Sequence, residues 1–110
     1  MKQYLTTEQT AKLIELGFEN PKGWYVDGVT NNINLYVNID KKPIMFNYSI
    51  GELLSFLPLT IQWTPRVIRG NVIEYSFETE GSELYYCNVH NELIDNLFDM
   101  CVKLKEEGVI

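Results

Sequence analysis

The stretch 89-VHNELIDNLFDMCVKLKEE-107 decides the fold of this chain. Its apolar residues recur at spacings of three and four, which predicts an amphipathic helix over about Val89–Glu107 with one broad apolar arc. That arc contains Leu93, Ile94, Leu97, Phe98, Met100, Cys101 and Leu104. The opposite side carries Glu92, Asp95, Asn96, Asp99, Lys103 and Glu106. Such a wide arc is buried against another layer of structure, and we expect a sheet beneath it.

Strands are predicted on the amino-terminal side of this helix. From Ile33 to Ile39 every second residue is aliphatic, the period of a half-buried strand. Asp40–Lys42 then reverses the chain into a second alternating segment that ends at Tyr48, so a β-hairpin is expected. A short strand over Trp24–Val26 precedes it.

Three further strands are expected. Leu59, Ile61 and Trp63 alternate before Pro65, which suggests an edge strand or a bulge. The second contains Ile73, Tyr75 and Phe77 after a Gly70-Asn71 turn, and the third covers Leu84 to Cys87.

Two capping boxes predict two more helices. Thr6 and Gln9 begin the first, and Gly17 ends it in a Schellman motif with Phe18 folded back on Leu13. The second begins at Ser49 with Glu52 and stops before Pro58, because proline disfavours helical geometry in the preceding residue.

Together these elements predict one α+β domain over residues 1–110, with a mostly antiparallel sheet of about five strands and two to three helices packed chiefly on one face. Hydrophobic residues make up 45% of the chain, enough for a buried core. The longest apolar runs are too short to cross a bilayer, so we expect no membrane association. The first ten residues lack a signal-peptide pattern, which favours the cytoplasm.

The formal net charge of −6 disfavours direct binding to nucleic acids, because their phosphates are neutralised by lysine and arginine. His90 is the only histidine, and no Cys/His spacing suits zinc, so we expect no catalytic residue, metal ligand or cofactor. His90 is expected to cap the last helix or to pack beneath it. Cys87 and Cys101 are interpreted as buried free thiols.

Two candidate interaction surfaces stand out. Asn34, Tyr36 and Asn38 alternate along one strand and lie beside Asn47 of its hairpin partner, giving an uncharged face centred on an aromatic ring. Exposed asparagines also occur on strands without any partner. A second surface consists of Glu92, Asp95 and Asp99 on one helix side. These acids either attract a basic protein or form a solvated face that complements the helix dipole.

Other residues leave alternatives open. Arg66 and Arg69 either bind an anion or an acidic helix, or pair across strands with Glu74 or Glu78. Phe56 and Trp24 fall off the main apolar faces. Each is either a satellite of the core or an exposed anchor, and we expect core contact.

Two segments carry a resemblance. The sequences 48-YSIGELLSFLP-58 and 93-LIDNLFDMC-101, followed by the end 107-EGVI-110, resemble small uncharacterised proteins from prophages and mobile elements of gut Bacteroidales. The resemblance covers about the last two thirds of the chain. It implies a bacterial or phage cytoplasmic setting and attaches no activity or site residue.

These observations favour a non-enzymatic accessory or protein-interaction module with an unidentified protein partner. In a sharper form, it is an acidic decoy that occupies a basic host protein. The alternative is a small enzyme with carboxylate or tyrosine acid-base chemistry, using Tyr36, Glu74 or Glu78 in a sheet-helix cleft. A third hypothesis is a homo-oligomer formed through the hairpin edge or Phe56.

Overall fold

The last helix, α3, spans Leu93–Glu106 in the computed structural model, which describes residues 2–21, 24–26, 33–35, 47–77 and 84–110. It begins four residues later than predicted. The reason is a side-chain contact, because the main-chain N–H of His90 donates to Oδ1 of Asn96 at 3.0 Å and the His90 carbonyl accepts from Nδ2 of Asn96 at 3.0 Å. The main chain before Leu93 is therefore held outside the helical hydrogen-bond pattern.

Four strands form one antiparallel sheet in the order β3 (Thr60–Ile61), β4 (Thr64–Arg69), β5 (Val72–Tyr75) and β6 (Tyr85–Cys87). The predicted strands after the Gly70-Asn71 turn and before Cys87 are confirmed. Gly70 has a φ of 60° at the first central position of that turn, where glycine avoids the steric cost of a side chain.

The edge strand expected before Pro65 is confirmed, because β3 lies at one edge of the sheet. It has only two residues and is followed by a turn at Gln62 and Trp63. Pro65 then lies inside β4, opposite Thr60. The alternation of Leu59, Ile61 and Trp63 does not correspond to one continuous strand, because the chain reverses at Gln62 and Trp63.

A separate antiparallel pair is formed by β1 (Trp24–Val26) and β2 (Ile33–Leu35). The short strand expected at Trp24–Val26 is confirmed, and so is the start of the strand expected from Ile33. The remainder of that strand and the Asp40–Lys42 reversal lie outside the described residues. The strands of the structure therefore divide into a four-stranded sheet and this pair.

The helices α1 (Thr7–Glu15) and α2 (Ile50–Phe56) both begin with the predicted capping boxes. The predicted Schellman motif at the end of α1 is also confirmed. Gly17 has a φ of 102°, its N–H donates to the Ile14 carbonyl, and the N–H of Phe18 donates to the Leu13 carbonyl at 3.1 Å. These ends are local in origin, which explains why the sequence predicts them well.

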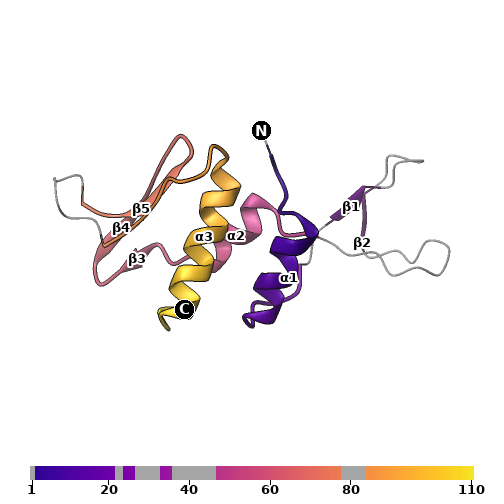
Figure 1. Ribbon diagram of the computed structural model, residues 1–110, viewed down its shortest axis with the longest axis horizontal. Helices are drawn as coiled ribbons and strands as arrows, with labels where there is room; N and C mark the ends of the chain where they lie inside the picture. Colours follow the sequence, from indigo (N-terminus) through magenta and orange to yellow (C-terminus); the bar gives the residue numbers. More distant parts are fainter. Residues whose placement is uncertain (1, 22–23, 27–32, 36–46, 78–83) are drawn as a thin grey trace.

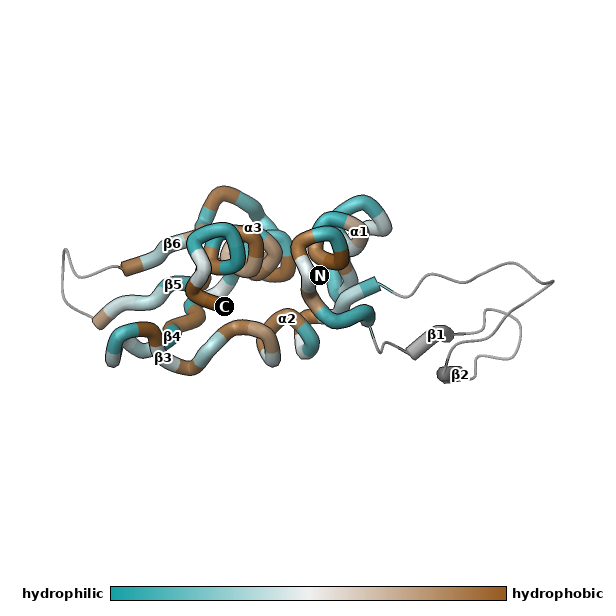
Figure 2. The backbone as a smooth tube through the Cα atoms, turned by 90° about the horizontal axis from the view of Figure 1, so that it is seen from below, coloured by the Kyte–Doolittle hydropathy of each residue, from teal (hydrophilic) through white to brown (hydrophobic). Residues whose placement is uncertain are grey.

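The three helices and the four-stranded sheet share one core. Helix α3 contacts β5 and β6 on one side and α1 and α2 on the other, as Figures 1 and 2 show. The fully buried residues include Ile73 and Tyr75 of the sheet, Leu97 and Met100 of α3, and Leu53 of α2. The predicted α+β class is confirmed, with the helices packed against the four-stranded sheet. No helix among the described residues is long and apolar enough to cross a membrane.

One residue of the predicted polar side of α3 is buried. Asn96 has no exposed surface, although the sequence placed it with Glu92, Asp95 and Asp99. Its amide is satisfied by main-chain groups, since Nδ2 donates to the Asn71 carbonyl at 2.6 Å as well as to that of His90. Burial of this polar side chain is acceptable because hydrogen bonds replace those with water.

Candidate interaction surface

The turn between β3 and β4 presents Trp63 to solvent. Ile61 pairs with Thr64, so Gln62 and Trp63 form a two-residue hairpin loop. Their φ angles are 49° and 67°, as in a type I′ turn. Asparagine and glycine are the usual residues in such a turn, and a bulky side chain in the left-handed region costs about 1–2 kcal/mol. A tryptophan in this position is therefore unfavourable for folding.

Three exposed apolar residues lie at the end of the sheet that this turn forms, and we call them the apolar end: Trp63, Phe77 and Leu84. They are 90%, 51% and 40% exposed, respectively. Strand pairing places them at this end, because the N–H of Ser76, next to Phe77, donates to the Pro65 carbonyl, and that of Leu84 donates to the Tyr75 carbonyl. Aromatic and leucine side chains exposed as a group are typical of interaction sites.

The two arginines of β4 have structural roles. Arg69 lies 3.8 Å from a carboxylate oxygen of Glu74, so the predicted cross-strand pairing is confirmed for this arginine. Arg66 takes a role that the sequence did not predict. Its guanidinium donates to the carbonyls of Leu54 and Leu57 at 3.0 and 3.1 Å, at the carboxyl end of α2. A cation at that position complements the helix dipole.

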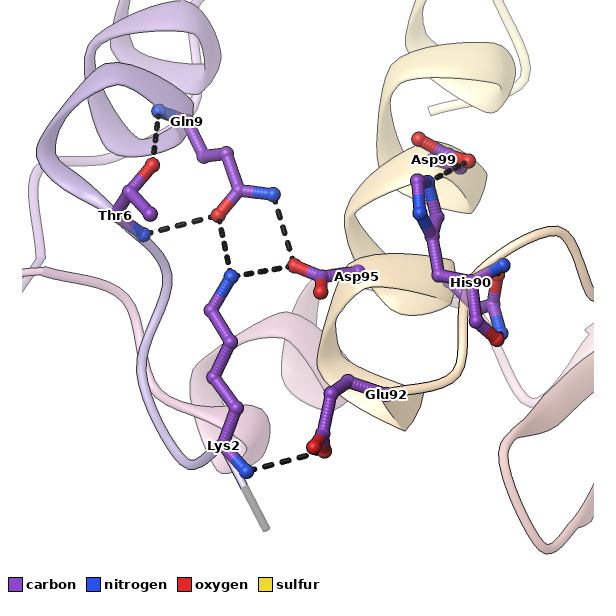
Figure 3. A network of polar contacts seen from close by, with 8 residues as sticks. Lys2, Thr6, Gln9, His90, Glu92, Asp95 and Asp99 are labelled. Carbon is purple, nitrogen blue, oxygen red and sulfur yellow. Dashed lines mark hydrogen bonds and ion pairs between the residues drawn. The ribbon is translucent and has the colours of Figure 1, made fainter.

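The predicted acidic surface is tied to the amino-terminal segment, as Figure 3 shows. The Lys2 ammonium lies 2.6 Å from Oδ1 of Asp95, and Gln9 donates to the same oxygen at 2.9 Å. The main-chain N–H of Lys2 donates to Glu92 at 3.0 Å. Burial alone would raise the pKa of Asp95, but the hydrogen bonds from Lys2 and Gln9, with the Lys2 charge, lower it below 3.8. Two of the three acids thus connect α3 to the start of the chain.

The third acid, Asp99, pairs with His90. The imidazole Nε2 lies 2.9 Å from Oδ2 of Asp99, and both side chains are partly exposed (Figure 3). The expectation that His90 caps the last helix is wrong, because α3 begins after Glu92 without a side-chain capping bond. His90 instead lies beside the helix and contacts its second turn.

The predicted amide face is described only in part. Tyr36 and Asn38 lie outside the described residues, and for Asn34 the structure describes only its place in β2 opposite Tyr25. Asn47 precedes α2, and its Oδ1 atom is buried without a hydrogen-bond partner in the described part of the chain. That these four residues form one surface stays a prediction.

The cysteines and Phe56 belong to the interior. Cys87 and Cys101 are buried free thiols, as predicted. Burial, with a smaller effect of Cys87, raises the pKa of Cys101 to about 12. Phe56 packs against Phe18 and Tyr48 at ring-centroid distances of 5.1 and 5.5 Å, so its expected core contact is confirmed. Trp24 lies in β1, but its side-chain contacts are outside the description.

Glu74 does not lie toward the helices. It alternates with Ile73 and Tyr75, which face α3, so its side chain is on the opposite face of the sheet, next to Arg69. It lines neither of two open grooves on the helical side. One, of about 370 Å³, includes Lys12, Phe98 and Val102, and another, of about 410 Å³, includes Phe18, Ser55 and Lys105. Glu78 and Tyr36 lie outside the described residues.

The described residues contain no group of three or more histidine, cysteine or acidic side chains that could hold a metal ion. No protein-family model, curated protein or solved structure matches the chain. The apolar end is thus the surface with the clearest physical signature. Sequence reasoning missed it because Gln62-Trp63 lacks the residues that normally mark a hairpin turn.

Proposed function

We propose that this chain is a non-enzymatic interaction module that binds a partner protein through the apolar end of its sheet, with Trp63 as the anchor. The observation that carries this proposal is the combination of exposure and strain at one residue. Trp63 is 90% exposed and adopts a φ of 67°. This side chain contributes little to the core, and its bulk makes the positive φ unfavourable. A role outside folding best explains why a tryptophan occupies this position.

The neighbours of Trp63 support an anchor. Phe77 and Leu84 lie at the same end of the sheet and are also exposed, so they offer further apolar area there. Tryptophan is enriched among the few residues that supply most of the binding energy at protein interfaces. A rigid two-residue loop between paired strands also limits the entropy lost when the side chain is bound.

The charge of the chain favours a protein over a lipid surface. Exposed tryptophan and leucine suit both kinds of partner, but a formal net charge of −6 opposes approach to anionic lipids. The same charge steers the chain toward a protein with a basic surface. The partner we propose therefore offers an apolar pocket with cationic side chains near it.

The test is affinity co-purification from the native host with the wild type and three variants. Trp63→Gly and Trp63→Ala both remove the indole, and each should lose the same specific protein. Val89→Ala is the matched control, because Val89 is 82% exposed but lies beside the first turn of α3 rather than at the apolar end. It should retain that protein.

The proposal fails if both Trp63 variants retain every specific partner. It also fails if the wild type binds phosphatidylcholine vesicles through Trp63 and no protein. A salt titration of the recovered complex supplies a further criterion. Binding through apolar groups survives moderate salt, whereas binding through carboxylates weakens steeply.

The acidic decoy stays a second proposal, and the contacts of α3 constrain it. Glu92, Asp95 and Asp99 all have partners within the chain, so charge reversal at Asp95 would also break its contacts with Lys2 and Gln9. Glu106 and Glu107 are exposed and better suited to that test. The cytoplasmic prophage setting, the enzyme alternative and the amide face likewise stay predictions.

A further inference from the structure

Strand β6 forms one edge of the four-stranded sheet, and among the described residues no strand pairs with its outer side (Figure 2). The register shows which main-chain groups face that side. The N–H of Ser76 donates to the Pro65 carbonyl, so the main chain of Glu74, two residues earlier, also bonds toward β4. Ile73 and Tyr75 then bond toward β6 through Cys87 and Tyr85. The N–H and carbonyl of Tyr86 consequently point away from the sheet.

The sequence of this edge lacks the residues that commonly block pairing. The segment 84-LYYCNV-89 contains no charged residue, proline or glycine, although such residues commonly block exposed edges. Both edge strands are short, with three residues in β6 and two in β3. Leu84 and Tyr86 are also 40% and 43% exposed, so apolar and aromatic surface accompanies the unpaired main-chain groups.

We propose that a second copy of this chain pairs with β6 in antiparallel orientation, around a two-fold axis at Tyr86. In this arrangement the N–H of each Tyr86 donates to the Tyr86 carbonyl of the other copy, and the two sheets become one continuous sheet. Both unpaired groups are satisfied by the same residue, which is the self-complementarity that a two-fold interface requires. The inference does not depend on Trp63, although Leu84 belongs to both surfaces.

The local charge favours a second copy as the occupant of this edge. Because residues 84–89 are uncharged, two copies bring no like charges into direct contact at the paired strands. The net charge of −6 on each copy still produces long-range repulsion. Salt screens this repulsion, so the dimer should become tighter as ionic strength rises. A complex with a basic protein would respond in the opposite direction.

Sedimentation velocity of the full chain tests this proposal. We expect the wild type to dimerise reversibly between about 1 μM and 1 mM, within the range of a small interface. Tyr86→Lys adds one charge to each edge and should weaken the dimer by about tenfold or more. Leu59→Lys is the matched control, because Leu59 is 73% exposed at the opposite edge of the sheet. It should leave the dimer unchanged.

A second measurement covers the case in which Tyr86→Lys unfolds the domain. In the wild type, the amide hydrogen of Tyr86 should exchange more slowly as protein concentration rises, because the dimer protects it. A wild type that stays monomeric at about 1 mM in both low and high salt overturns the proposal. The proposal is also overturned if Leu59→Lys weakens the dimer and Tyr86→Lys leaves it unchanged. The proposal also fails if the chain stays monomeric and β6 instead binds an extended peptide from another protein.

Discussion

The side-chain amide of Asn96 donates a 2.6 Å hydrogen bond to the main-chain carbonyl of Asn71, which joins α3 to the turn between β4 and β5. The Asn71 side chain in turn donates to the His90 carbonyl at 2.7 Å. Two segments far apart in the sequence are thereby fixed to the first turn of the helix. The amide of Asn96 is fully buried and has three main-chain partners, so its position specifies how the helix meets these segments.

Asn96→Ala should destabilise the domain by about 2 kcal/mol, because it leaves partly buried main-chain groups of Asn71 and His90 without these partners. Urea denaturation measures the change. Asn91→Ala serves as the control, since Asn91 is exposed just before the helix. Equal stability of the two variants would contradict the role assigned to Asn96.

Trp63→Gly should increase the free energy of unfolding by about 1 kcal/mol, because glycine adopts a φ of 67° without steric cost. Trp63→Ala should bring no such gain, since alanine retains the strain. Thermal denaturation of both variants separates relief of strain from loss of the indole. If glycine gives no more stability than alanine, the turn is not strained.

Asp95→Asn should reduce the loss of stability in acid. Burial raises the folded-state pKa of Asp95, but Lys2 and Gln9 lower it by more. The ionised carboxylate therefore contributes its full stabilisation of the folded state above the ordinary pKa of 3.8, and this stabilisation is lost as pH falls through the folded-state pKa. Stability measured from pH 6 to about pH 2 should therefore fall less in the variant than in the wild type. Glu106→Gln, an exposed acid on the same helix, should leave the slope unchanged.

Tyr75→Phe should reduce the loss of stability in alkali. Burial raises the pKa of Tyr75 to about 12, and its hydroxyl donates to the Pro58 carbonyl at 2.5 Å. The folded state favours the neutral phenol. The stabilisation that Tyr75 provides is therefore fully present below its ordinary pKa of 10.0 and is lost as pH rises toward 12. Tyr4→Phe, at an exposed tyrosine, is the control. Parallel alkaline profiles for wild type and Tyr75→Phe would refute this assignment.

Both native thiols should be unreactive toward a disulfide reagent until the chain unfolds. Burial raises the pKa of Cys87 and that of Cys101, so little thiolate forms near neutral pH. Val89→Cys provides the positive control, because that position is 82% exposed and should react at once. Rapid labelling of two thiols in the native wild type would be the contrary result.

The predictions from sequence succeeded where a structure depends on nearby residues. Thr6 and Gln9, Ser49 and Glu52, and the glycine at position 17 act within a few positions, and the structure has each of them as expected. They were less successful where a distant partner decides the outcome. Asn96 lies on the polar side of α3 by periodicity, yet a turn 25 residues away in the sequence supplies its hydrogen-bond partner and buries it.

The sequence by itself determined the helices, most of the strands of the sheet and the α+β class, because hydrophobic period and capping chemistry are properties of short segments. Only the tertiary structure decided which polar side chains contact remote segments. Examples are Lys2, which pairs with Asp95, and Arg66, which donates to the end of α2. It also decided that Trp63 lies at a solvent-exposed turn rather than in a strand. These outcomes depend on contacts between remote segments, and the local sequence pattern does not predict such contacts.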